Sequence, residues 1–465
     1  MDVPSLHPRM SRRSAIRSLV AGSTLFPGLV SELLAESSDP MTPRLPHFPA
    51  KAKRVIFLFM SGGVSHVDGF DPKPKLLADD GKSITLGDPH DKKTYTLAKP
   101  QWPFRPRGRC GTTVTDLFPH MAECVDDLCV IRSMKEDLGD HYGSTLGMHT
   151  GSTSFARPSI GSWISYGLGT FNRNLPSFLV ISPALPSTGT VIWSSDFLPG
   201  VHQGTRVVPG PEPIRDVKPL SASADIQKSE LAWMTAFNRR HLEARGADGA
   251  LAARLRSFET AFGLQMEAPD VFDLSGESDD TLALYGLKRG EAKGFAWQCL
   301  VARRFAERGV RFIELIDTNN SWDAHTDMQT HAPLAKNVDK PIAGLLKDLK
   351  RRGMLDETLV VWTSEFGRTP FKEAAFGTDT KVGRGHHSNG FSSWLAGGGV
   401  KGGLAYGATD EHGLKVAEKQ VHLHDFHATI LHLMGLDHTK LTFRHAGRDF
   451  RLTDVHGEVV REVTR

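Results

Sequence analysis

Short runs of bulky apolar residues, separated by amphipathic segments, constrain the fold of this chain most strongly. The runs cover residues 54–60, 178–181, 310–316 and 358–363. Each is too short for an average helix and lacks alternation with polar residues, so each predicts a strand buried on both faces. Residues 292–308 and 334–352 instead carry apolar groups at the spacing of a helix. Apolar strands alternating with helices predict an α/β fold, with a mostly parallel central sheet covered on both faces.

Charge and cysteine content exclude some classes of protein. The 465 residues include 56 Lys and Arg and 53 Asp and Glu, a formal net charge of +3, with basic and acidic residues interspersed. This near-neutral balance favours no nucleic-acid partner. The spacing of the four cysteines matches no zinc motif, and they are interpreted as thiols, with a Cys124–Cys129 disulfide as the alternative.

The N-terminal segment resembles an export signal. Arg12 and Arg13 precede a moderately apolar stretch that ends at Ala35, a pattern typical of twin-arginine signals. Gly22, Pro27 and Glu32 interrupt the stretch and make it a poor transmembrane span. We therefore expect residues 1–35 to be a signal read by the twin-arginine export machinery, and the protein to be periplasmic or extracellular. An ordinary basic amphipathic N-terminus is the alternative.

Residues 36–52, rich in Pro and Ser, predict a linker, and residues 53–465 then form the main domain.

Carboxylates and imidazoles follow the predicted strands, where ligands bind in parallel sheets. The candidates after the strands are Asp68, Asp71, Asp323, His325 and Glu365, followed later in the chain by His386 and His387. Mixed carboxylate and imidazole ligands suit Zn²⁺, Mn²⁺ or related ions, so these residues predict a divalent metal site whose identity (Zn, Ca or Mn) stays open. Asp327 and His331, four residues apart on one helix face, are a rival to Asp323 and His325. Isolated surface residues are the plainer interpretation of each group alone.

Several segments resemble known families. Residues 338–367 are similar to a sulfatase segment in which a helix leads to a strand and a metal-binding acid, and residues 424–435 resemble a later sulfatase helix. On further motifs the chain is identified as a member of domain-of-unknown-function family 1501, exported sulfatase-like proteins of the alkaline phosphatase superfamily. These motifs lie at residues 65–74, 149–151, 322–325, 365–370, 396–399 and 407–410. The resemblance implies a three-layer sandwich with bound metal.

The chain departs from the sulfatase pattern at two places. Phe366 stands where the superfamily has a ligand, and no cysteine is available at the sulfatase nucleophile position. Counting back from Thr150-Gly151 reaches His141 and Ser144, which become the candidate nucleophile or base, with His141 also a candidate ligand or helix cap. Arg368 is a candidate for holding an anionic ester, or else a simple ion-pair partner.

Two functions follow from these residues. The first is a metal-dependent hydrolase acting on sulfate or phosphate esters of a small molecule or glycan. The second is a non-catalytic, metal-stabilised binding protein for extracytoplasmic glycans, favoured by Phe366 and by the missing nucleophile.

Overall fold

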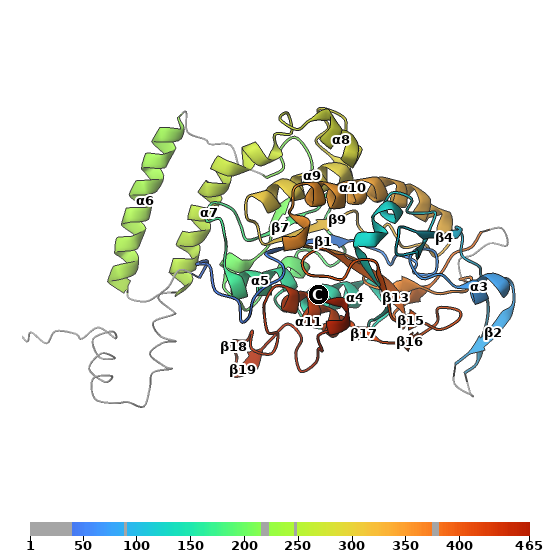
Figure 1. Cartoon of the computed structure of the whole chain (residues 1–465). Coiled ribbons are helices and arrows are strands. Elements are labelled where there is room, and N and C mark those ends of the chain that lie inside the picture. The colour runs from blue at the N-terminus through green and yellow to red at the C-terminus, as the bar shows by residue number, and fades with distance from the viewer. Residues whose placement is uncertain (1–39, 88–90, 215–222, 246–248, 374–380) are drawn as a thin grey trace, which may run out of the picture.

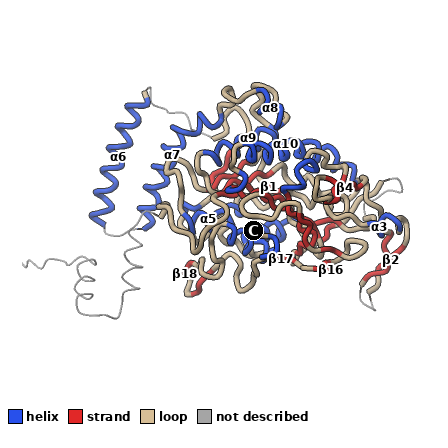
Figure 2. The backbone as a smooth tube through the Cα atoms, in the orientation of Figure 1, coloured by secondary structure: helices blue, strands red, loops and turns tan. Residues whose placement is uncertain are grey.

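A computed structural model describes residues 40–87, 91–214, 223–245, 249–373 and 381–465. Its central element is a nine-stranded sheet (Figures 1 and 2). The strand order is β14 (Leu404–Tyr406), β6 (Leu128–Lys135), β13 (Phe391–Ala396), β10 (Thr358–Thr363), β1 (Arg54–Phe59), β9 (Phe312–Ile316), β7 (Phe178–Ile181) and β8 (Thr205–Val207), and β17 (Val421–His422) also pairs with β6. Only β13 runs antiparallel to its neighbours among these strands, so the predicted mostly parallel sheet is confirmed.

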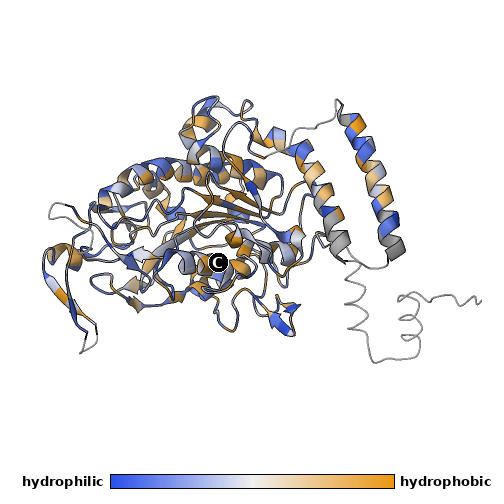
Figure 3. Cartoon of the chain, turned by 180° about the vertical axis from the view of Figure 1, so that it is seen from behind, coloured by the Kyte–Doolittle hydropathy of each residue, from blue (hydrophilic) through white to orange (hydrophobic). Residues whose placement is uncertain are grey.

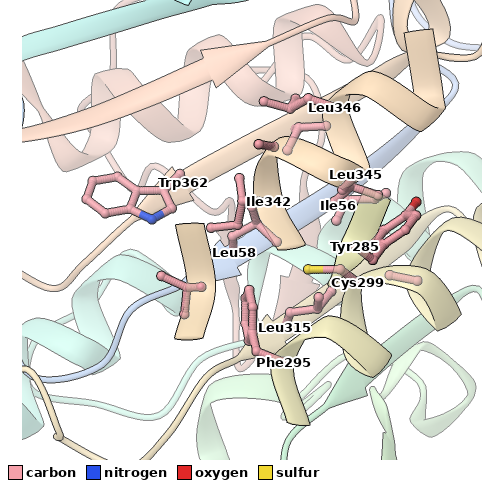
Figure 4. Close-up of a cluster of buried hydrophobic side chains, with 14 of the residues drawn as sticks. Ile56, Leu58, Tyr285, Phe295, Cys299, Leu315, Ile342, Leu345, Leu346 and Trp362 are labelled. Atoms are coloured by element: carbon pink, nitrogen blue, oxygen red, sulfur yellow. The ribbon is translucent and has the colours of Figure 1, made fainter. Parts of the chain in front are cut away.

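Helices cover both faces of this sheet, which gives the expected three layers (Figure 2). One face carries α8 (Asp279–Tyr285), α9 (Gly294–Glu307) and α10 (His331–Arg351), and the other carries α4 (His141–Thr150), α5 (Ile160–Leu168) and α11 (Leu423–Leu433). Alternate residues of β1 point to opposite faces: Ile56 and Leu58 join the first core, and Phe57 and Phe59 the second. Figure 4 shows part of the first core, where Ile342 and Leu345 of α10 meet the strands.

Smaller elements lie around this body. They are α3 (Pro74–Ala78) and the hairpins β2 (Ser83–Leu86) with β3 (Lys93–Thr96), β4 (Phe104–Arg107) with β5 (Thr112–Thr115), β15 (Ala408–Thr409) with β16 (Val416–Glu418), and β18 (Phe443–His445) with β19 (Arg448–Phe450). Two long helices, α6 (Ala224–Arg245) and α7 (Gly249–Phe272), project from one end (Figure 1).

The predicted export signal, residues 1–35, lies outside the described residues. In the described part of the predicted linker, Arg44 and Phe48 donate backbone hydrogen bonds to the carbonyls of Leu168 and Gly435, so this segment packs on the body. All four cysteines are free thiols. No helix within the described ranges combines the length and apolarity needed to cross a bilayer.

Candidate metal centre

The ends of three neighbouring parallel strands define the site. Gly62 follows β1, Asp323 lies in the loop after β9, and Glu365 follows β10. Because β9, β1 and β10 are adjacent and parallel, their carboxyl ends meet at one edge. Gly62 has a φ of +119°, and a Cβ there would lie 2.6 Å from the backbone nitrogen of Trp322. This glycine therefore allows the end of β1 to approach the loop that carries Asp323.

His141 reaches this edge from the start of α4. Asp140 caps that helix by accepting a hydrogen bond from the Gly143 amide at 2.8 Å. The His141 Nδ1 atom lies 2.7 Å from Oε1 of Glu365, so it donates its proton to that carboxylate. In the neutral ring the Nε2 atom then carries the lone pair, and it lies 3.2 Å from Oδ2 of Asp323.

His386 reaches the same carboxylate from a two-residue strand. The strand β12 (His386–His387) pairs with β11 (Gly367–Arg368), with His386 opposite Arg368. Its Nδ1 lies 2.7 Å from the carbonyl of Gly139 and donates to it, which leaves a lone pair on Nε2. That Nε2 lies 3.3 Å from Oδ1 of Asp323 and 2.9 Å from Nε2 of His325. The His325 Nε2 is itself 3.0 Å from the same Oδ1.

These contacts suit a divalent metal ion. Within the described ranges, His141, Asp323 and His386 form the one set of three such side chains whose ligand atoms lie within 4.8 Å of one another. Metal-binding histidines characteristically donate the second ring nitrogen to a carboxylate or a backbone carbonyl, as His141 and His386 do here. Their side chains are 16% and 23% exposed, so the centre is accessible from solvent.

Glu365 holds His141 rather than facing the ion. It is fully buried, and its carboxylate accepts hydrogen bonds from the Gly62 amide at 2.8 and 3.1 Å and from the Ser364 hydroxyl at 3.0 Å. With His141 Nδ1 as a further donor, both oxygens of the carboxylate accept hydrogen bonds from protein groups. We therefore assign Glu365 the role of orienting His141, in place of the expected role of ligand.

Arg368 makes its hydrogen bonds to other groups of the protein. Its guanidinium is fully buried and donates to the carbonyls of Gly62, Gly63 and Arg384 and to Asp323 Oδ1, the last at 2.6 Å. The expected substrate-binding role does not fit this environment, because the side chain has no exposed surface. Arg368 instead fixes the turn after β1 and the orientation of Asp323.

The close approach of these charged side chains shifts the pKa values of Asp323 and His141. Burial opposes ionisation of Asp323, but the neighbouring His141, His386 and Arg368 side chains outweigh burial and hold the pKa of Asp323 well below the usual range. Burial lowers the pKa of His141, but Asp323 and Glu365 outweigh it and raise that pKa to about 9. In the metal-free protein at neutral pH, His141 therefore carries the positive charge that an ion would replace.

Metal binding should therefore depend steeply on pH. The pKa of His141 is raised from 6.5 to about 9, so the stabilisation from its charged form is complete below about pH 6.5 and is lost as the pH rises through 9. A bound ion displaces this proton, and we expect about one proton released per ion at pH 7 and an affinity rising about tenfold per pH unit up to pH 9. Titration calorimetry in buffers of different ionisation enthalpy measures both. An affinity that does not change between pH 7 and 9 would contradict this assignment.

Three other predicted ligands are engaged elsewhere. The fully buried Asp68 pairs with Arg384 at 2.8 Å and accepts from the Ser65 hydroxyl at 2.6 Å. Asp71 pairs with Lys73 at 2.9 Å. His387 points its buried ring toward His66, with ring centroids 5.7 Å apart, although it neighbours His386. The structure does not bring these three into the cluster, because charged partners and core packing occupy them.

The remaining candidates also lie outside the cluster. Ser144 is fully buried and donates its hydroxyl proton to the carbonyl of Leu138 at 2.8 Å, so it is not presented as a nucleophile. Of the rival pair, Asp327 caps a short helix and pairs with Lys381 at 3.1 Å. His331 is buried edge-on against Trp322.

Phe366, in contrast, lies beside the imidazoles. Its ring centroid is 5.0 Å from that of His141 and 4.7 Å from that of His386. It forms an apolar wall that restricts the two rings. The Gly139 carbonyl, which orients His386, was not predicted, because a backbone oxygen leaves no signature in the residue type at that position.

Fold and site together define an α/β protein with a candidate metal centre at the carboxyl edge of a mostly parallel sheet. The model of a family described as "Protein of unknown function (DUF1501)" matches residues 52–464, and the chain belongs to this family. No curated protein matches the chain.

Similar solved structures are distant. An alkaline phosphatase from the Antarctic bacterium TAB5 is 12% identical, with 83% of this chain and 98% of that one covered and a TM-score of 0.31. The PsFucS1 sulfatase from Pseudoalteromonas sp. is 12% identical, with coverage of 87% and 70% and a TM-score of 0.32. The lipoteichoic acid synthase LtaP from Listeria monocytogenes is 8% identical, with coverage of 89% and 79% and a TM-score of 0.37.

Proposed function

We propose that this chain is an exported, metal-dependent hydrolase of sulfate or phosphate esters. The observation that carries the proposal is the convergence of His141, His386 and His325 on the single carboxylate of Asp323. A bound divalent ion would supply a Lewis acid for the ester oxygen and a means of ionising water at neutral pH.

The protein residues have separate tasks in this proposal. Asp323, His141 and His386 hold the ion, and His325 lies close enough to join them or to exchange a proton with the reacting groups. Glu365 keeps the Nδ1 proton on His141, so that the Nε2 lone pair stays directed at the ion. Because the described cluster presents no serine, threonine or cysteine nucleophile, we favour direct attack by water over a covalent intermediate.

The proposed substrate class and the proposed export are supported by the family and by the N-terminal sequence, not by the metal centre. Membership of the family, which the sequence resemblance associates with exported sulfatase-like proteins, favours an ester substrate outside the cytoplasm. The Arg12-Arg13 pair supports export and an encounter with small-molecule or glycan esters. The alternative, a non-catalytic glycan-binding protein, is favoured by the burial of Ser144 and Arg368, which leaves neither free to engage an ester.

Turnover of a defined ester panel separates these two functions. The metal-loaded protein is assayed on sulfate and phosphate esters, including sulfated oligosaccharides, before and after chelation. We expect hydrolysis of at least one ester, loss of more than about 99% of the rate on chelation, and recovery when metal is returned. Full metal occupancy with no turnover and retained glycan binding would favour the non-catalytic function.

A further inference from the structure

The helix α6 turns several large hydrophobic residues toward solvent. Trp233 and Phe237 are 75% and 65% exposed, and their rings stack with centroids 6.2 Å apart. Ile226 and Met234 on the same helix are also about half exposed. Figure 3 shows this helix at the edge of the molecule, with hydrophobic residues along its length. Solvent-facing aromatic side chains on one helix face are typical of an interaction surface.

The opposite stripe of α6 is the one that packs on α7. Gln227, Leu231 and Thr235 are spaced four residues apart, so they share one helix face, and all are less exposed than the aromatic pair. Gln227 donates a hydrogen bond to Gln265 of α7 at 2.8 Å. The stripe of Gln227, Leu231 and Thr235 therefore faces α7, and no element among the described residues covers the aromatic stripe.

Residues on the exposed stripe are arranged symmetrically about the middle of the helix. Trp233 and Phe237 lie two positions on either side of Thr235, and Glu230 and Arg240 lie five positions on either side. The spacing of these four residues is three, four and three, which is the spacing of a coiled-coil seam. When two copies of the helix pack antiparallel around Thr235, Trp233 meets Phe237 of the partner and Glu230 meets Arg240.

We infer that this chain forms a two-fold symmetric dimer through antiparallel packing of α6 against α6 of a second copy. A two-fold interface must be complementary to itself, and this stripe is, both in its aromatic pair and in its acid–base pair. Glu230 and Arg240 carry opposite charges at mirror-related positions of this stripe, which suits a second copy of the helix better than a lipid surface. The helix has 22 residues and is roughly 33 Å long, so it offers a modest interface and an expected Kd in the micromolar range.

Sedimentation velocity of the full chain over a range of concentrations tests the dimer. We expect a species of twice the 51.0 kDa chain mass at tens of micromolar. Trp233→Glu together with Phe237→Glu should weaken the dimer by about a hundredfold or more. The matched control is Phe155→Glu, which changes an equally exposed phenylalanine outside α6 (71% exposed) and should leave the Kd unchanged.

A charge exchange tests the antiparallel register itself. Glu230→Arg and Arg240→Glu should each weaken the dimer by roughly tenfold, because each places like charges opposite each other. The double variant restores an acid–base pair and should return the Kd to within about threefold of the original. Such rescue cannot come from misfolding of the single variants. A chain that stays monomeric at ~100 µM, a dimer insensitive to the aromatic double variant, or failure of the charge exchange to rescue would each overturn the inference.

Discussion

Replacing Asp323 by Asn should reduce the affinity for a divalent ion by more than about a hundredfold. Asp323 is the only carboxylate among the three proposed ligands His141, Asp323 and His386. The rings of His141, His325 and His386 all lie close to this carboxylate. Asparagine keeps the size of the side chain but removes the negative charge that attracts the cation. Elemental analysis of the protein, after reconstitution with metal and gel filtration, measures the metal bound per chain.

Asp327→Asn is the matched control for this variant. It changes a carboxylate four residues away in the same loop, which pairs with Lys381 at 3.1 Å and faces no imidazole of the cluster. This variant should retain one ion per chain with unchanged affinity. If Asp327→Asn lost the metal and Asp323→Asn kept it, the rival pair of Asp327 and His331 would be the true ligands.

Asp68→Asn should lower the free energy of unfolding by about 3–5 kcal/mol and leave the metal bound. The Asp68 carboxylate and the Arg384 guanidinium are both fully buried, so the substitution leaves an uncompensated charge in the interior. The backbone carbonyls of Ala98 and Thr369 that Arg384 also contacts cannot neutralise it. Urea denaturation measures the loss of stability, and elemental analysis of the folded variant measures the metal.

An exposed ion pair provides the control for this second variant. Glu123 pairs with Lys347 on the surface, where both side chains are well exposed, so Glu123→Gln should change stability by less than about 1 kcal/mol. Asp68→Asn protein that is fully stable and free of metal would show that Asp68 is a ligand, and would contradict the structural role assigned to it.

The sequence predicted the parallel strands at the centre of the sheet but not the antiparallel strand beside them. The strands β1 and β10 have uninterrupted apolar cores and β9 is apolar except for Glu314; all three were predicted, as were α9 and α10 from their helical periodicity. The antiparallel β13 was missed because Ser392 and Ser393 interrupt its apolar run. Ser393 is nonetheless fully buried, and its hydroxyl hydrogen-bonds to that of Thr363 at 2.7 Å.

The sequence indicated several of the side chains that lie together at this edge, but not the partners of the others. Asp323, His325 and His386 were expected as ligands because polar residues after parallel strands meet at one edge, and the structure brings them together. Asp68 and Asp71 also follow a parallel strand, yet Asp68 pairs with Arg384 and Asp71 pairs with Lys73. Arg384 is more than 300 positions from Asp68 in the chain, and a single sequence carries no signal that the two are paired.

Anomalous diffraction from crystals grown with Zn²⁺ or Mn²⁺ tests the central claim most directly. We predict one peak about 2.0–2.3 Å from Nε2 of His141, Nε2 of His386 and a carboxylate oxygen of Asp323, with Glu365 still hydrogen-bonded to His141. A peak between Asp68 and Asp71, or full loading of the crystal with no ion beside Asp323, would contradict the assignment of this metal centre.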